Sequence, residues 1–302
     1  MSEQDKVKEL WEAPTKQVKH SLGAGEERYW IIHPTVRQCI NEVLSGDRTL
    51  NLFDVIRTKF EIPFDRVLVL GSAAGSGRNL LRMQSARFVD VVEPSSTLIE
   101  EARKDAASAG LSSRINFKVM DLNNPSLPPE KYDMVLANMS MHNIKNLEQL
   151  FEQVRGTLKP SGLFIVNDYV GPSRYLFQDK QIELMNWLLD LLPPQYKIKV
   201  TDGAIKGSIA KLEEKNLSPN STDSIRSGEI IQLLEKYFEP VMRKDYGGTL
   251  LQFALADIVG NFSPDELKDV TMLRMIYKIE QLLIREKVIE SDFVFMVLKK
   301  KT

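Results

Sequence analysis

The sequence predicts an α/β fold in which a mostly parallel sheet carries helices on both faces. From residue 66 to residue 167, short apolar runs alternate with helical segments, which is typical of strands buried on both faces of a parallel sheet. Two more strand candidates, 240–246 and 292–298, follow near the end of the chain, and we expect the last one to be antiparallel. Together these runs predict a doubly wound, seven-stranded sheet.

The parallel strands are expected at the apolar runs, with helices between them. The runs cover residues 67–70, 88–92, 115–119, 134–136 and 163–166. Helical segments separate them in five strand–helix repeats, among them 97–109 and 147–158. The long helix before the last strand is predicted to open with a capping box at Ser263, Pro264 and Glu266, because serine, proline and glutamate at these positions favour a helix start.

Helical segments outside the strand–helix alternation predict how the chain is divided into an N-terminal segment and a sheet domain. We expect residues 1–63 to form an N-terminal helical segment or lid, because apolar residues there recur at spacings of three and four. Residues 64–302 are expected to form the sheet domain. The alternation breaks at about 170–235, which predicts a helical insertion above the carboxyl edge of the sheet. Its main helix, near 179–192, is stopped by two prolines.

Composition and charge exclude several classes of function. Lys plus Arg number 40 and Asp plus Glu number 41, so no overall field favours nucleic acid or an anionic membrane. No apolar run approaches the length of a membrane span, and no secretion signal stands at the start. Cys39 is the single cysteine, and the three histidines lack ligand spacing. We therefore expect a cytoplasmic protein without a metal site.

A loop of glycine and small residues follows the first predicted strand. It contains Gly71, Ser72, Ala73 and Gly75 and leads into a helix, so that backbone N–H groups can approach a ligand closely. Its spacing does not fit a dinucleotide fingerprint, because Ala73 and Leu80 stand where glycines are required. It also lacks the Gly-Lys pair of a phosphate-binding loop. A nicotinamide cofactor is therefore only a weaker alternative.

An acid ends the second predicted strand. Glu93 follows Gly71 by about twenty residues, the distance at which a carboxylate accepts hydrogen bonds from ribose hydroxyls. Taken alone, Glu93 would equally be a surface acid or a helix cap. Together with the loop, it favours a ligand that contains adenosine.

The motifs of this region resemble those of class I S-adenosylmethionine-dependent methyltransferases, which have a Rossmann-like fold. The matching stretches are the Gly71 loop, Val-Val-Glu93-Pro94, Val-Met-Asp121-Leu122, the run from Tyr132 through Asn138 and Met139 to His142, and Leu158-Lys-Pro-Ser-Gly162-Leu. The resemblance extends from about residue 66 to residue 168 and resumes in the last strands. It implies S-adenosyl-L-methionine as the cofactor and methyl transfer as the reaction.

The resemblance also implies which residues hold this cofactor. The loop residues Gly71, Ser72, Ala73 and Gly75 would lie beneath its methionine part. Glu93, followed by Pro94, would bind the ribose, and Asp121 with Leu122 would recognise the adenine. Asn138 and Met139 would line the cofactor and open toward the acceptor.

Some positions depart from the family pattern. Val69 stands where an acid is common, and Ala73 stands where glycine is common. The alternative to an active enzyme is therefore a catalytically silent module that binds S-adenosylmethionine or contacts other proteins. Stretches around Gly171, Arg226 and Tyr246 resemble a bacterial subgroup associated with glycan or envelope biosynthesis.

A hydroxyl acceptor would need a base near the methyl group, since methyl transfer from a sulfonium is an in-line displacement. His142 follows the fourth predicted strand on the carboxyl side of the sheet, so it is either this base or a histidine packed under the next helix. Asp168 ends the fifth strand, where it could orient His142, bind a metal or cap a turn. We expect O-methylation of a small-molecule or glycan acceptor.

Overall fold

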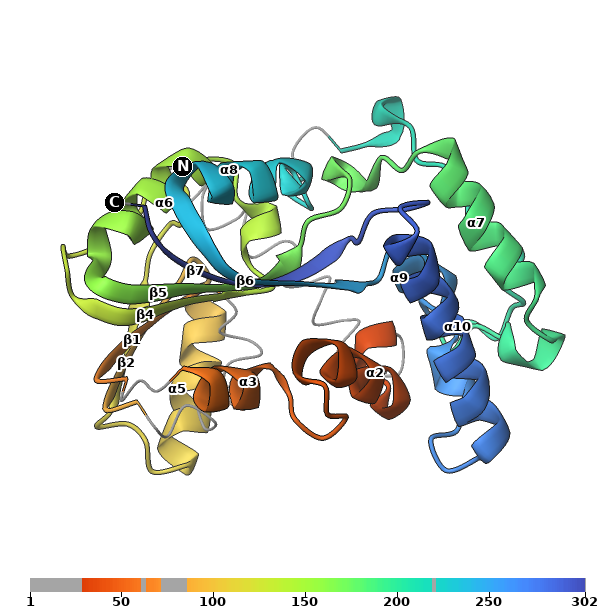
Figure 1. Cartoon of the computed structure of the whole chain (residues 1–302), viewed down its shortest axis with the longest axis horizontal. Helices are drawn as coiled ribbons and strands as arrows, with labels where there is room; N and C mark the ends of the chain where they lie inside the picture. Colours follow the sequence, from red (N-terminus) through yellow and green to blue (C-terminus); the bar gives the residue numbers. More distant parts are fainter. Residues whose placement is uncertain (1–28, 61–63, 72–85, 219–220, 302) are drawn as a thin grey trace.

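A seven-stranded sheet forms the centre of the described part of the chain, in the order β3-β2-β1-β4-β5-β7-β6 (Figure 1). This computed structural model describes residues 29–60, 64–71, 86–218 and 221–301. The strands are β1 (Arg66–Leu70), β2 (Phe88–Glu93), β3 (Ile115–Val119), β4 (Tyr132–Asn138), β5 (Leu158–Tyr169), β6 (Phe238–Gly247) and β7 (Phe293–Lys300). The first five strands are parallel, and β7 is antiparallel to both β5 and β6. The predicted fold class is confirmed.

Helices cover both faces of the sheet, which is why its strands are apolar on both sides. Figure 1 shows α6 (Leu147–Thr157) and α8 (Ile230–Tyr237) on one face, and α2 (Pro34–Ser45), α3 (Leu52–Lys59) and α5 (Ser96–Ser108) on the other. In β1, Leu68 and Leu70 belong to the core on the α6 and α8 side, whereas Val67 and Val69 belong to the opposite core. Alternate residues of one strand thus pack into the two cores on opposite faces of the sheet.

The remaining helices lie beyond β5, β7 and β6 at one end of the molecule. They are α7 (Asp179–Asp190), α9 (Leu251–Ala254) and α10 (Leu267–Arg285) (Figure 1). Short 3₁₀ helices are η2 (Trp30–Ile32), η3 (Met141–Asn143), η4 (Ser173–Tyr175), η5 (Pro194–Tyr196), η6 (Glu214–Asn216), η7 (Ser227–Glu229) and η8 (Val259–Asn261). Across the described residues, no helix combines the length and apolarity needed to cross a bilayer.

The stretch between β5 and α8 contains α7 as its main helix. Met185, Leu188 and Leu189 of α7 are buried, so the helix packs onto the domain through its apolar face. Asn186 binds the following loop in both directions: its amide donates to the Ile209 carbonyl at 3.0 Å and accepts from the Ile209 N–H at 2.7 Å. These contacts hold the loop after α7 against the helix.

The N-terminal helix α2 packs beside α10, far along the chain. Arg274 donates to the Gln38 amide oxygen at 3.1 Å, and the Lys278 ammonium lies 3.5 Å from the Glu42 carboxylate. Trp30, just before α2, is buried with its ring 5.6 Å from that of Phe293 at the start of β7. The earliest described segment is therefore part of the core, while the lid role predicted for residues 1–63 stays a prediction.

The prediction of five strand–helix repeats is wrong at one connection. β3 and β4 are joined by residues 120–131, which form turns and extended chain. The segment contains Pro125, Pro128 and Pro129, and proline lacks the N–H that a helix interior needs. The Leu127 N–H donates to the Gln153 side chain of α6 at 3.0 Å, so the connection is held by the neighbouring helix.

The predicted capping box of the long helix is also wrong. α10 begins at Leu267, and the Ser263 hydroxyl accepts a hydrogen bond from the Asp265 N–H at 3.3 Å, which belongs to a local turn. The Asp269 carboxylate turns back instead and accepts from the Ser263 N–H at 2.9 Å and from the Tyr196 hydroxyl. This contact with a distant tyrosine, which the local pattern does not contain, decides where the helix starts.

A tight turn between β6 and α9 carries two glycines with positive φ, Gly247 at +100° and Gly248 at +84°. The fully buried Glu280 carboxylate of α10 accepts hydrogen bonds from the N–H groups of Gly248, Leu250 and Leu251 at 2.8, 2.7 and 3.1 Å. A Cβ at Gly248 would overlap the ring of Phe293. The turn therefore requires glycine both for its backbone angle and for space.

We expect Gly248→Ala to lower the free energy of unfolding by about 3–4 kcal/mol, of which roughly 1–2 kcal/mol is the left-handed backbone and the rest the clash with Phe293. Urea denaturation followed by circular dichroism measures this change. Gly46→Ala is the matched control, because Gly46 has φ +86° with nothing within 4 Å of the added Cβ. Gly46→Ala should lose only the free energy that comes from the left-handed backbone. Equal losses of unfolding free energy in the two variants would contradict the steric argument.

Candidate active site

The parallel strands end at one edge of the sheet, and the described candidate residues lie at or just after these ends. Gly71 follows β1, Glu93 ends β2, Asp121 comes shortly after β3, and Asn138 ends β4. Asp168 is the penultimate residue of β5. In open α/β sheets, ligands bind at this edge where the strand order reverses, which is here between β1 and β4. The fold therefore brings the described candidates to the expected ligand-binding edge.

Gly71 lets the ends of β1 and β4 approach each other. It has φ +65°, and its N–H donates to the Val92 carbonyl at 2.8 Å. A Cβ at this position would lie 2.7 Å from the Cβ of Ser140 and 3.5 Å from Leu122. The Ser140 hydroxyl in turn donates to the Leu70 carbonyl at 2.8 Å. Only glycine satisfies both the backbone angle and this close approach.

Three of the predicted loop residues, Ser72, Ala73 and Gly75, lie outside the described residues, so their predicted role stays a prediction. Val69, the position at which an acid is common in the family, is buried in β1. The predicted absence of a metal site likewise stays a prediction, although the described part of the chain holds no cluster of three or more His, Cys, Asp or Glu side chains that could bind an ion.

Glu93 is buried at the end of β2, with 6% of its surface exposed. Its Oε1 accepts a hydrogen bond from the Ser95 N–H at 3.0 Å. The Ser95 hydroxyl, and not Glu93, caps α5 by accepting from the Leu98 N–H at 3.3 Å. Pro94 between them is buried as well. Glu93 is therefore not a surface acid, and the cap of α5 is Ser95.

Asp121 and Leu122 form the turn after β3. The Asp121 carboxylate accepts from the Asn123 N–H at 2.9 Å, and Leu122 is 2% exposed. The Asn123 side chain accepts from the N–H groups of Lys145 and Asn146 at 2.8 and 3.1 Å. This turn is thereby tied to the start of α6, and Leu122 reaches Gly71 across the edge of the sheet.

Asn138 and Met139 follow from β4 into the loop beyond it. The Asn138 amide oxygen accepts from Asn167 at 2.7 Å, and Asn167 accepts from the Tyr246 hydroxyl at 2.9 Å. Met139 has φ +53° and is partly exposed, and its N–H donates to the Asn167 carbonyl at 2.7 Å. The chain thus turns away from the sheet at Met139, which leaves this side chain at the edge.

His142 and Asp168 form a hydrogen-bonded pair across the ends of β4 and β5. The His142 Nδ1 lies 2.5 Å from the Asp168 Oδ1. Asp168 is fully buried, and the His142 side chain is 13% exposed. The other carboxylate oxygen accepts from the N–H groups of Ser140 and Met141 at 2.9 and 2.7 Å. Asp168 therefore both orients His142 and caps the turn that carries it.

Tyr169 completes the surroundings of His142, and its position could not be predicted from the local pattern. The two rings meet edge to face with centroids 6.4 Å apart. The Tyr169 hydroxyl donates to the Pro172 carbonyl at 3.1 Å, and burial raises the pKa of this tyrosine. The side chain thus packs against the histidine and keeps its proton at neutral pH.

Ser140 is the site residue that the sequence analysis missed. It connects three strand ends, because its hydroxyl binds Leu70, its N–H binds Asp168 and its Cβ faces Gly71. The only local signal is a small hydroxyl residue two positions after a predicted strand end, and such residues are common in loops for other reasons.

Comparison with known families and proteins agrees with this geometry. Residues 69–162 match the model of a family described as a methyltransferase domain. We call this stretch the methyltransferase domain, after the family model that it matches. It contains the described site residues from Gly71 to His142, and Asp168 lies six residues beyond it.

Curated proteins are similar to parts of the chain. A highly reducing polyketide synthase from Emericella nidulans is 32% identical over 113 residues, which are 34% of this chain and 4% of that protein. A sterol 24-C-methyltransferase from Clavispora lusitaniae is 25% identical over 51% of this chain and 42% of its own length. A 27-O-demethylrifamycin SV methyltransferase from Amycolatopsis mediterranei is 28% identical over 35% of this chain and 39% of its length. The chain spans less than half of each relative.

Solved structures match a larger share of the chain, at low identity. A geranyl diphosphate C-methyltransferase from Streptomyces coelicolor A3(2), in complex with S-adenosyl-L-homocysteine, has a TM-score of 0.52 at 14% identity, with 99% of this chain and 98% of that chain covered. The [4+2]-cyclase SpnF has a TM-score of 0.50 at 13% identity, with 89% and 94% covered. These likenesses show the class I methyltransferase fold around the methyltransferase domain.

We expect Asp168→Ala to lower the free energy of unfolding by about 2–4 kcal/mol, because the Ser140 and Met141 N–H groups would lose a charged acceptor. Chemical denaturation at pH 7 measures the loss. His142→Ala is the control, since it leaves both N–H groups bound to Asp168, and it should cost roughly 1 kcal/mol or less. Similar losses in the two variants would show that the turn does not depend on the carboxylate.

Proposed function

We propose that the chain transfers the methyl group of S-adenosyl-L-methionine to a hydroxyl of a small-molecule or glycan acceptor. The observation that carries this proposal is the His142–Asp168 pair at the carboxyl ends of β4 and β5, with His142 inside the methyltransferase domain and Asp168 just beyond it. The edge of the sheet offers a cofactor site, and the histidine offers a base beside it.

The side chains at the edge suit this cofactor chemically. Glu93 and Asp121 present carboxylates at the ends of β2 and β3, and carboxylates accept hydrogen bonds from ribose hydroxyls and from the adenine amino group. The apolar side chains of Leu122 and Met139 would contact the flat base and the thioether. Gly71, Ser72, Ala73 and Gly75 would hold the amino-acid part, and Pro94 and Asn138 would complete the site.

When bound, the cofactor supplies a methyl group activated by a positively charged sulfur. His142 would remove the proton from an acceptor hydroxyl as oxygen forms its new bond. Because the Asp168 carboxylate accepts from Nδ1–H, the neutral imidazole carries its lone pair on Nε2, where a proton can be taken. The same carboxylate stabilises the imidazolium that results. Tyr169 limits rotation of the ring from one side.

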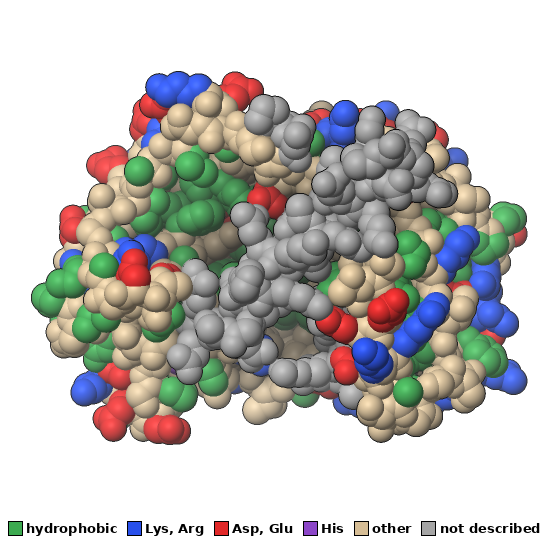
Figure 2. Space-filling model, turned by 180° about the vertical axis from the view of Figure 1, so that it is seen from behind, with side chains coloured by type: hydrophobic (Ala, Val, Ile, Leu, Met, Phe, Trp, Pro, Cys, Tyr) green, Lys and Arg blue, Asp and Glu red, His purple; other side chains and the backbone are tan. Residues whose placement is uncertain are grey.

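A hydrophobic hollow on the surface is consistent with the proposal that the acceptor is a small molecule. Figure 2 shows green side chains lining a concave surface, toward the side of the molecule on which Figure 1 places α7. A mostly apolar hollow with a few polar groups at its edge is typical of a small-molecule site. Relatives include an enzyme named as a 24-C-methyltransferase of sterols and one named for a 27-O-demethyl substrate, and the base at His142 favours oxygen here.

Labelled cofactor tests the proposal directly. The full chain is incubated with S-adenosyl-L-methionine carrying a tritiated methyl group and with fractionated metabolite and oligosaccharide pools. We expect label in a small product that resists mild base, as a methyl ether does. Tight binding of the cofactor without transfer to any pool would favour the alternative, a catalytically silent module that binds the same cofactor.

We expect Glu93→Ala to weaken the binding of S-adenosyl-L-homocysteine by about 10- to 150-fold, because a buried carboxylate would no longer accept from the ribose hydroxyls. Calorimetric titration measures the dissociation constant. Asp105→Ala, an exposed acid on α5, is the control and should bind as the unaltered chain does. Unchanged affinity in Glu93→Ala would contradict the proposal that Glu93 binds the ribose hydroxyls.

We expect His142→Ala to lower kcat by roughly 10²- to 10⁴-fold through loss of the base, with cofactor affinity nearly unchanged. Asp168→Asn should also lower kcat, because an amide N–H facing Nδ1 would force the other tautomer of the imidazole. Initial rates and cofactor titrations separate the two effects. Full turnover by His142→Ala would mean that the histidine is only packed at the site.

A further inference from the structure

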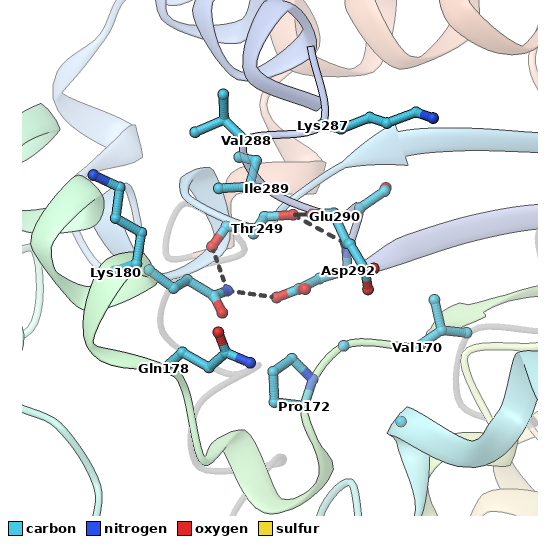
Figure 3. Close-up of a pocket in the computed structure, with 14 residues that line it drawn as sticks. Val170, Pro172, Gln178, Lys180, Thr249, Lys287, Val288, Ile289, Glu290 and Asp292 are labelled. Atoms are coloured by element: carbon cyan, nitrogen blue, oxygen red, sulfur yellow. Dashed lines mark hydrogen bonds between the residues drawn. The ribbon is translucent and has the colours of Figure 1, made fainter. Parts of the chain in front are cut away.

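A cavity lies where the end of β5 meets the start of β7. Its volume is about 550 Å³, and five segments line it: residues 170–172 after β5, the start of α7, Gly228 of η7, the turn after β6 and residues 287–292 before β7 (Figure 3). Neither the proposed cofactor site nor the proposed base includes any of these residues. The cavity is therefore a feature that methyl transfer at His142 leaves unexplained.

A buried carboxyl faces this cavity. Asp292 is 4% exposed, and its Oδ2 accepts one hydrogen bond, from the Gln181 amide at 3.0 Å. The same amide donates to the Thr249 carbonyl at 3.0 Å, while the Thr249 hydroxyl accepts from the Asp292 N–H at 3.0 Å. Within the described residues, no donor forms a hydrogen bond to Oδ1. One oxygen is thus fixed by the protein and the other is left for a ligand.

Gly171 forms the wall next to this carboxyl. A Cβ at position 171 would overlap the Asp292 carboxyl carbon and lie 2.7 Å from Oδ1. Any side chain larger than hydrogen would therefore displace the carboxyl from its position. On the opposite side, the Gln178 side chain extends toward the cavity from the segment that precedes α7 (Figure 3). Its amide can donate and accept hydrogen bonds to a bound molecule.

The charged groups that the structure describes around Asp292 leave its negative form without a counter-ion. Glu280 of α10 and Glu290 are the acids whose fields act on it, and Gln181 is neutral. Lys180 and Lys287 also line the cavity, but both are exposed and Figure 3 shows their ammonium groups pointing away from Asp292. Burial, with the fields of Glu280 and Glu290, raises the pKa of Asp292 to about 8.

We propose that this cavity binds a small ligand through a primary or secondary ammonium group, with Asp292 as the counter-ion and Gln178 as a second hydrogen-bonding partner. This inference does not depend on the proposed methyl transfer.

An ammonium fits the carboxyl better than a hydroxyl does. A buried carboxylate is unfavourable unless a positive charge compensates it, and the described neighbours supply only a neutral amide and two acids. An ammonium brings both the missing charge and up to three N–H donors for Oδ1 and Gln178. A hydroxyl would bring a donor alone. The cavity volume admits a molecule larger than the amine itself, so the rest of the ligand would fill the space beside Val288 and Ile289.

Calorimetry with benzylamine and benzyl alcohol, two probes of nearly equal shape, tests this inference on the full chain near pH 7. Titrations in phosphate and in Tris, which differ in heat of ionisation, give the number of protons exchanged on binding. Asp292 is mostly protonated at this pH, so binding of the ammonium should release close to one proton. Benzyl alcohol should bind more weakly and release none.

Asp292→Asn removes the charge and keeps an acceptor for Gln181, so the variant should fold, which its thermal melt verifies. We expect it to bind benzylamine at least roughly tenfold more weakly and without proton release. Lys180→Ala, on the cavity rim, is the matched control and should bind as the unaltered chain does. Equal binding of the amine and the alcohol, unaltered binding by Asp292→Asn, or no binding of benzylamine would each overturn the proposal.

Two sources could supply the ammonium group, the methyl acceptor itself or a separate effector. Mass spectrometry after incubation with the methyl donor distinguishes them, because only an acceptor gains a methyl group. Both outcomes support the ammonium site, and neither requires the site at His142 to be active.

Discussion

The Asp168 carboxylate is the contact on which the candidate site depends. It is fully buried, and it gathers the Ser140 and Met141 N–H groups and the His142 imidazole at the end of β5. Such an acid is favourable in the interior only because several donors surround it. Its position decides where the loop after β4 turns. Through Ser140, it also decides how closely that loop approaches Gly71 on β1.

The same principle appears farther along the same edge of the sheet, where β7 begins and β6 ends, with different consequences. Glu280 is satisfied by three N–H groups from the turn after β6, and it fixes α9 and α10 relative to β6 and β7. Asp292 lies near it with a single neutral donor, facing a cavity. A buried acid with a full set of donors holds the fold together. A buried acid with an open oxygen costs stability, and a ligand can offset that cost.

The local pattern of the chain predicted the sheet well because buried parallel strands must be apolar on both faces, which short runs such as 67–70 display directly. It failed where local and distant contacts compete. The turn at Ser263 looks like a helix start, but the carboxylate of Asp269 and the hydroxyl of Tyr196 place the start at Leu267. Between β3 and β4, prolines and the Gln153 side chain of α6 replace the expected helix.

The sequence by itself predicted the doubly wound sheet. It also predicted a glycine just after β1 and acids at the ends of β2 and β3 as site residues. Periodicity and residue type sufficed for this because they act over a few positions. The sequence named His142 and Asp168 but left open whether they meet. Only the tertiary structure decided that, since the two lie 26 residues apart and a hydrogen bond forms between them only when β4 and β5 pair in register. The cavity at Asp292 is likewise tertiary, because its walls come from five segments separated along the chain and brought together by packing.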